Sequence, residues 1–326
     1  MQAVRPAPLV LVLLAASALL VAAGTAVGSL GWEPLFSAGA GNAAILWDIR
    51  MPRTLGAWLA GALLGLAGAI AQGLFRNPLA DPYLLGSAAG AAFGVALLLM
   101  LGSVPALATG WFAGLGLTGA AFAGAVVAVG ITLLLARGVQ QSLRLLLAGV
   151  IVGMVFGALS SLVMFLVPDL MRTMQAFLLG STGFLGWPAV GLLALSFVVS
   201  LAAGVGCSRA LDALALGEGT AASLGVGVGA VRVALVAALA LATGAAVAHV
   251  GLVAFIGLLA PHLVRALVKT THRWLLPLSA LAGGVLLLGA DVLARWVLAP
   301  RELPVGVLTA VLGGGYLLFL LHRRPA

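Results

Sequence analysis

The residues of this sequence that could act as nucleophiles, acids or bases are few, and they do not form a catalytic set. The chain has four histidines, eight carboxylates and one cysteine, Cys207. It contains no serine–histidine pair, aspartate pair or HExxH segment of the kind that membrane proteases use. A single cysteine can form neither a disulfide framework nor a cysteine-cluster metal site. We therefore expect no catalytic residue and no metal site.

A nucleotide-binding loop is also missing from the sequence. The sole lysine, Lys269, stands in the segment LVKTT. The glycines that cradle phosphate in a GxxxxGK[ST] loop do not precede it. If ATP drives this protein, another chain must bind the nucleotide.

The remaining charged residues suggest ion pairs rather than proton transfer. Asp291 lies four residues before Arg295, the spacing at which two side chains meet on one face of a helix. A channel or proton-coupled carrier would place ionisable residues within its spans. Such residues are few here, and His249 lies near one end of its predicted span. A secondary transporter and a membrane enzyme are therefore minor alternatives.

The elements that position these residues must lie in a membrane. Of the 326 residues, 63% are hydrophobic and 7% are charged, and the mean hydropathy is +1.25. A soluble domain carries roughly 25% charged residues because its surface faces water. The composition therefore predicts an all-α integral membrane protein.

Long stretches without a charged residue define the predicted spans. A helix needs about 20 apolar residues to cross a bilayer. The segment 82–136 can hold two spans joined by a turn near 102–110. The segment 233–264 is either one long helix or a full helix followed by a short one, with the break expected at Gly251. The chain then has nine or ten spans. The charge-free stretches are 6–32, 54–75, 82–136, 145–168, 173–208, 233–264, 274–290 and 303–322.

The basic residues predict the orientation of these spans. With ten spans and both termini in the cytoplasm, eleven basic residues lie inside and five lie outside, as the positive-inside rule requires. The net charge of +8 therefore reflects membrane topology, and we expect no nucleic-acid partner. A cleaved signal peptide at the N-terminus is the alternative. The five outer residues are Arg50, Arg53, Arg172, Arg295 and Arg301.

We expect one permease domain, residues 1–326, with short segments outside the membrane. These are about 33–52, 167–187, 209–232 and 299–304. The amphipathic segment 169–185 predicts a short helix outside the membrane core, and Pro188 is expected to open the next helix. Glycines at helical spacing, as in GALLGLAG (61–68), predict close helix packing in lipid.

Several motifs resemble those of the FecCD family, which comprises the permeases of type II ABC importers for iron–siderophores, haem and cobalamin. They occur in family order from residue 50 to about residue 313. The motifs are RMPR (50–53), NPLADP (77–82), LGSAAG (85–90), LLLAG (145–149), ALGE (215–218), FIGLLAPHLVR (255–265), ADVLAR (290–295) and ELPVG (302–306).

The resemblance implies a homodimer with about ten transmembrane helices per subunit in the inner membrane. It also implies two cytoplasmic ATPase subunits, which hold ATP and Mg²⁺, and a periplasmic substrate-binding protein. This chain itself is then a non-catalytic permease that binds no cofactor. Its cargo would be an iron chelate, siderophore or haem, moved to the cytoplasm by alternating access. Cobalamin is the alternative cargo, and a scaffold subunit is disfavoured by the matched motifs.

Three outer arginines match the family's docking residues for the binding protein: Arg50, Arg53 and Arg295. A guanidinium pairs bidentately with a carboxylate, which suits a wet rim. Arg50 and Arg53 could instead anchor a helix end at the lipid headgroups. For Arg295 the competing interpretation is a structural pair with Asp291, and both roles can coexist.

Two cytoplasmic regions match family sites for coupling and gating. The segment Leu216, Gly217, Glu218 and Gly219 matches the ATPase-coupling helices, and its glycines permit a tight turn between two short helices. An ordinary solvated loop is the alternative. The gate residues implied are Asn77, Leu79 and Ser142.

Two histidines are candidates for contact with a haem-like cargo, since a neutral imidazole binds iron. His262 lies in the family motif PHxxR, which recurs whatever the substrate, so a structural role is preferred. His249 is the possible substrate contact. A packing role is the default expectation for it.

Overall fold

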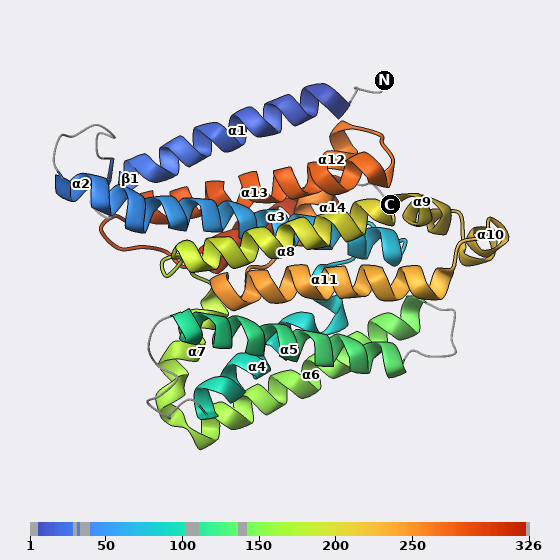
Figure 1. Ribbon diagram of the computed structural model, residues 1–326, viewed down its shortest axis with the longest axis horizontal. Coiled ribbons are helices and arrows are strands. Elements are labelled where there is room, and N and C mark those ends of the chain that lie inside the picture. The colour runs from blue at the N-terminus through green and yellow to red at the C-terminus, as the bar shows by residue number, and fades with distance from the viewer. Residues whose placement is uncertain (1–5, 29–30, 33–39, 102–110, 136–141, 324–326) are drawn as a thin grey trace.

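The computed structural model describes residues 6–28, 31–32, 40–101, 111–135 and 142–323. These segments are almost entirely helical (Figure 1). The predicted turn at 102–110 lies outside the described residues. The long apolar helices are α1 (Pro6–Ala26), α3 (Met51–Leu74), α4 (Ser87–Leu101), α5 (Trp111–Leu135), α6 (Ser142–Leu166), α8 (Trp187–Gly206), α11 (Val228–Val250), α12 (Ile256–Leu267), α13 (His272–Trp296) and α14 (Val305–Arg323).

These ten helices account for the predicted membrane spans. Within the described segments, six helical stretches have the length and hydropathy of a full span. Shorter apolar stretches are α4, α12, residues Gly119–Leu135 of α5 and residues Val305–Phe319 of α14. The prediction of about ten transmembrane helices is therefore confirmed. The break predicted at Gly251 is also present: α11 ends at Val250, and Gly251 has a φ of +69°, a conformation that glycine adopts without steric cost.

Short elements connect the long helices. The predicted helix within 169–185 is α7, and α8 begins with Pro188 in its first turn. The segment expected outside the membrane at 33–52 is helical from Ala40 onward, because α2 and η1 lead directly into α3. The short elements are β1 (Val27–Gly28), β2 (Gly31–Trp32), α2 (Ala40–Ile45), η1 (Leu46–Arg50), η2 (Pro82–Leu85), η4 (Pro168–Leu170), α7 (Met171–Leu179), α9 (Ser208–Ala215) and α10 (Glu218–Ser223).

Helix α3 lies between α13 and α8 in the larger part of the bundle, while α4, α5 and α6 pack together beyond α11 (Figure 1). Every residue of α3 from Ala60 to Leu74 is buried. A Cβ atom at Gly61 would clash with the carbonyl oxygen of Gly283, and one at Gly65 with that of Ser279. The predicted glycine packing is thus the contact between α3 and α13, where the two backbones touch.

The two ends of the molecule carry different elements. Helix α1 begins at the end where α9 and α10 lie, whereas α2, β1 and α7 lie at the opposite end (Figure 1). We call the first the coupling end and the second the arginine end, because Arg53 stands in the first turn of α3 there. Because the ten long helices cross the bundle an even number of times, the start of α1 and the last residue of α14 lie at the same end.

Gly65→Ala should destabilise the protein by about 1–3 kcal/mol, because the new Cβ forces the α3 and α13 backbones apart. Thermal unfolding of the purified protein in detergent measures the effect. The matched control is Gly191→Ala on α8, where a Cβ meets nothing within 4 Å, so that the gain in helix propensity makes it neutral or stabilising. Equal melting temperatures for the two variants would contradict the packing argument.

Candidate functional site

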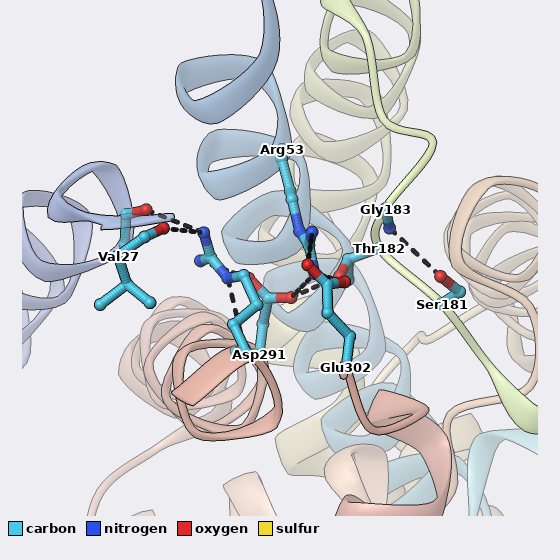
Figure 2. Close-up of polar contacts among 9 residues, drawn as sticks. Val27, Arg53, Ser181, Thr182, Gly183, Asp291 and Glu302 are labelled. Atoms are coloured by element: carbon cyan, nitrogen blue, oxygen red, sulfur yellow. Dashed lines mark hydrogen bonds and ion pairs between the residues drawn. The ribbon is translucent and has the colours of Figure 1, made fainter. Parts of the chain in front are cut away.

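Four charged side chains form a cluster at the arginine end. Arg53 comes from the start of α3, Asp291 and Arg295 from the last turns of α13, and Glu302 from the segment that joins α13 to α14. Figure 2 shows Arg53 pointing toward Asp291 and Glu302, and Arg295 Nη2 also binds the Asp291 carboxylate. We call these four residues the arginine cluster. Its formal charges sum to zero.

Asp291 is the buried centre of the arginine cluster. Its carboxylate is fully buried; it accepts from Arg295 Nη2 at 2.6 Å, from Arg53 Nη2 at 3.3 Å and from the Thr182 hydroxyl. A buried carboxylate costs several kcal/mol unless charges and hydrogen bonds compensate it. Two guanidinium groups and a hydroxyl supply that compensation, so removing either arginine would leave a buried charge poorly paired.

Arg295 is held inside the protein by several acceptors. Its side chain is 3% exposed, and Nη1 donates to the carbonyl oxygens of Gly24 at 2.8 Å and Val27 at 3.3 Å. The structural pair with Asp291, one of the two interpretations of Arg295, is therefore present. The residue also ties the end of α1 to α13. Docking through Arg295 stays a prediction, and it would require the buried guanidinium to become accessible.

Arg53 is shared between Asp291 and Glu302. Nη1 and Nη2 donate to Oε1 and Oε2 of Glu302, each at 2.9 Å, which is the bidentate fork of an arginine–carboxylate pair. The side chain of Arg53 is 13% exposed and that of Glu302 is 36% exposed. The remaining donor, Arg53 Nε, is buried without a hydrogen-bond partner in the described structure.

Arg50 lies one turn before Arg53 and is half-buried. Its Nη1 donates to the Thr25 carbonyl oxygen at 3.3 Å. Near it, Trp187 Nε1 donates to the backbone oxygen of Trp47 at 3.0 Å, and the two indole rings lie 5.0 Å apart. The structure thus brings Arg50 and Arg53 to one end of the bundle, as the sequence predicts, although their docking role is not tested by it.

At the coupling end, the predicted gate residues follow the last turn of α3. The amide of Asn77 donates to the Gln72 oxygen at 3.1 Å and that of Arg76 to the Gly73 oxygen at 3.3 Å, a Schellman ending of the helix. Arg76 has a φ of +51° there. Asn77 Oδ1 accepts from the amide of Leu79 at 2.9 Å, and both side chains are exposed.

The third predicted gate residue is only partly described. Ser142 is the first residue of α6, but its side chain and the preceding loop lie outside the described residues. Its relation to Asn77 and Leu79 stays a prediction.

The predicted coupling segment has the expected local structure. Two short helices, α9 and α10, are separated by Leu216 and Gly217, and Gly217 has a φ of +115°, which only glycine adopts readily. Leu216 is 69% exposed, and Gly219 has open space around it. Glu218 accepts from Arg232 Nη2 at 2.6 Å, so this carboxylate joins α10 to α11.

A pair that sequence reasoning missed connects α9 to the bundle. Asp212 Oδ1 faces His272 Nδ1 at 2.6 Å and also accepts from the His272 amide at 3.0 Å. A Cβ atom at Gly73 would lie only 2.8 Å from His272 Nε2, so the end of α3 packs against the same pair. The two residues are 60 positions apart, and no local spacing relates them.

Asp81 precedes and caps the helix η2 beside the predicted gate. Its Oδ1 accepts from the amide of Tyr83 at 2.8 Å, while the Tyr83 hydroxyl donates to the Val253 oxygen at 3.2 Å. Burial raises the pKa of Asp81 to about 6, against the lowering effect of the Tyr83 amide. Burial also raises the pKa of Tyr83, and the neighbouring Asp81 carboxylate adds to that rise.

Both candidate histidines contact neighbouring residues. His249 Nδ1 lies 2.9 Å from the Ala245 oxygen one turn earlier, a contact in which Nδ1 carries the proton. The His262 ring packs edge-on against Tyr316, with centroids 6.2 Å apart. Among the described residues, no three His, Cys, Asp or Glu side chains gather closely enough to hold a metal ion. The packing interpretations of both histidines agree with these contacts.

Comparisons with known proteins match nearly the whole chain. The sequence model described as the FecCD transport family matches residues 9–323. The hemin transport system permease protein HmuU of Yersinia pestis is 40% identical over 283 residues, which cover 86% of this chain and 84% of that protein. The vitamin B12 import system permease protein BtuC of Salmonella typhimurium is 42% identical over 282 residues, which cover 85% of this chain and 83% of that protein.

Solved structures agree with the sequence comparisons. An inward-facing ABC transporter of the metal-chelate type superposes with a TM-score of 0.84 and 27% identity, covering 98% of this chain and 100% of that one. PsaBC from Streptococcus pneumoniae superposes with a TM-score of 0.60 at 18% identity, covering 84% of this chain and 91% of that one. The second likeness supports the fold alone.

Asp81→Asn should stabilise the protein at neutral pH. The raised pKa means that Asp81 contributes most stability below about pH 4, and that this contribution is lost as the pH rises through about 6. Asparagine keeps the oxygen that caps η2 and carries no charge. We expect the variant to exceed the wild type by about 1–3 kcal/mol at pH 7.5 and to equal it near pH 4. Thermal unfolding in detergent at both pH values tests this; a pH-independent difference would contradict it.

Proposed function

Because the chain belongs to the FecCD transport family, we propose that it is the membrane permease of an ATP-driven importer that carries a metal chelate into the cytoplasm. The observation that carries this proposal is the family match over residues 9–323 together with relatives at 40% and 42% identity. Members of this family are permease subunits and not enzymes. ATP is hydrolysed by a separate subunit.

The cargo we propose first is an iron chelate, in particular haem. Two relatives are named for hemin and for vitamin B12, and both compounds are a metal held in a tetrapyrrole ring. This shared chemistry favours a large metal–tetrapyrrole chelate as cargo. Cobalamin is the second candidate, since the identity to the vitamin B12 permease (42%) is as high as that to the hemin permease (40%). An iron–siderophore is the third.

The two ends of the bundle suit two different partners. At the arginine end, guanidinium groups near the surface suit carboxylates of a periplasmic binding protein. At the coupling end, the turns that follow α9 and α10 present two exposed leucines, Leu216 and Leu224, which suit a cleft in a cytoplasmic ATPase. A second copy of this chain would complete the translocation pathway. In this arrangement the chain lies in the inner membrane with both termini in the cytoplasm.

Transport would follow from a change in the separation of the coupling ends. A ligand shifts a conformational equilibrium only by its difference in affinity for the two states. ATP meets this condition if it binds the closed pair of ATPases more tightly than the open pair. The closed pair would then move α9 and α10, and with them the turn at Asn77–Leu79 that follows α3.

Uptake by proteoliposomes that contain this chain, its ATPase and its binding protein tests the proposal. We expect ATP-dependent accumulation of haem, with cobalamin and an iron–siderophore offered in parallel. Arg50→Glu should reduce uptake at least tenfold, because the reversed charge repels the docking carboxylates. The matched control is Arg172→Glu, an exposed arginine of α7 outside the arginine cluster, which should retain uptake. Failure to accumulate any of the three, with an active ATPase bound, would overturn the metal-chelate proposal.

Leu216→Glu should weaken binding of the ATPase without changing the stability of the permease. Leu216 is 69% exposed, so a charge there meets water in the isolated chain but an apolar cleft in the complex. Co-purification of the ATPase and thermal unfolding of the permease measure the two effects. Phe184→Glu, at a residue that is 90% exposed near the arginine end, is the control. Equal co-purification for both variants would contradict the coupling role of this turn.

A further inference from the structure

We propose that Glu302 occupies the position on Arg53 that a carboxylate of the binding protein takes on docking. Docking then replaces the Glu302 carboxylate with the incoming carboxylate. This inference rests on the proposed function, since it requires a binding protein with acidic residues on its docking face. The inference goes beyond the proposed function because it assigns a role to Glu302 and names the event that docking triggers.

The fork of Arg53 is already filled in the isolated chain. Both terminal nitrogens donate to Glu302 at 2.9 Å, which is the geometry that a carboxylate of another protein would need. The arginine cluster is neutral as a whole. An incoming carboxylate would therefore gain little from approaching Arg53 unless one of the two acidic residues left.

Glu302 is the acidic residue that can leave. Asp291 is fully buried and also bound by Arg295 and Thr182. Glu302 is 36% exposed. In the described part of the chain, its carboxylate accepts hydrogen bonds from Arg53. An exposed ion pair contributes little to stability, so a second carboxylate can replace it at small cost. The buried, unpartnered Nε of Arg53 adds a donor that the present pairing does not use.

Release of Glu302 would loosen the segment that joins α13 to α14. This segment is otherwise tied back by the amide of Leu303, which donates to the Ala294 oxygen at 3.0 Å. Immediately after it, α14 begins with Gly306 pressed against the carbonyl oxygens of Leu179 and Leu252. Carboxylate exchange on Arg53 would thus allow docking at the surface to shift the start of α14.

The first test is the affinity of the binding protein for this permease in nanodiscs without nucleotide, measured by biolayer interferometry. Glu302→Gln keeps the size of the side chain but removes the competing charge, so it should bind about three- to tenfold more tightly than the wild type. Arg53→Gln should bind more weakly, and the double variant should bind like Arg53→Gln, because the gain needs the freed arginine. Asp48→Asn is the matched control: it removes an equal charge from an exposed residue at the same end, outside the arginine cluster.

The outcomes separate this inference from the proposed function. No binding to the wild type would overturn the docking role itself and, with it, this inference. Binding to the wild type with Glu302→Gln equal to Asp48→Asn, or weaker than the wild type, would overturn the exchange alone. A gain that persists in the double variant would do the same, since it would reflect general electrostatics.

A second measurement remains informative if Glu302→Gln is poorly folded. A spin label at the exposed position 301 reports the mobility of the segment between α13 and α14. In the otherwise native chain, adding the binding protein should increase this mobility. Unchanged mobility on confirmed docking would overturn the proposal.

Discussion

The close contact of the α3 and α13 backbones positions both candidate functional ends. In a membrane, water exclusion does not drive helices together, so association depends on packing and on hydrogen bonds. Gly61 and Gly65 allow α3 to touch Gly283 and Ser279 directly. This approach brings the start of α3 beside the last turns of α13, where Arg53 can reach Asp291. It equally brings the end of α3 beside the first turn of α13, at His272.

The α3–α13 pair therefore connects the two ends of the protein. Helix α3 has 24 residues, which span about 36 Å at 1.5 Å per residue. It starts with the docking candidate Arg53 and is followed by the gate candidates Asn77 and Leu79. Helix α13 runs from His272, which is paired with Asp212 of α9, to Arg295. In the proposed importer, these two helices in backbone contact would transmit displacement between the binding protein and the ATPase.

The charges of the chain are concentrated where they can be compensated. Asp291 and Arg295 are buried, but each has several partners. Deeper along α3, Gln72 donates to the Leu258 oxygen at 3.2 Å and accepts from Arg265, which joins α3 to α12 by polar contacts. Such contacts are tolerated in a low-dielectric interior only when they are satisfied. A permease can thus be built from these few charges, with its energy supplied by another chain.

The sequence by itself predicted the membrane class, about ten membrane spans, Gly251 as the place of a helix break and the family, because hydropathy, glycine conformation and motif order are local properties of the chain. It also predicted the pair Asp291–Arg295, since four residues make one turn of a helix. Only the tertiary structure decided that Arg53 faces Glu302, 249 residues away, and that Asp212 faces His272. It likewise decided that Arg295 is buried rather than displayed at the surface. The physical reason is that an ion pair between distant segments depends on which helices pack together, and spacing along the chain carries no record of that choice.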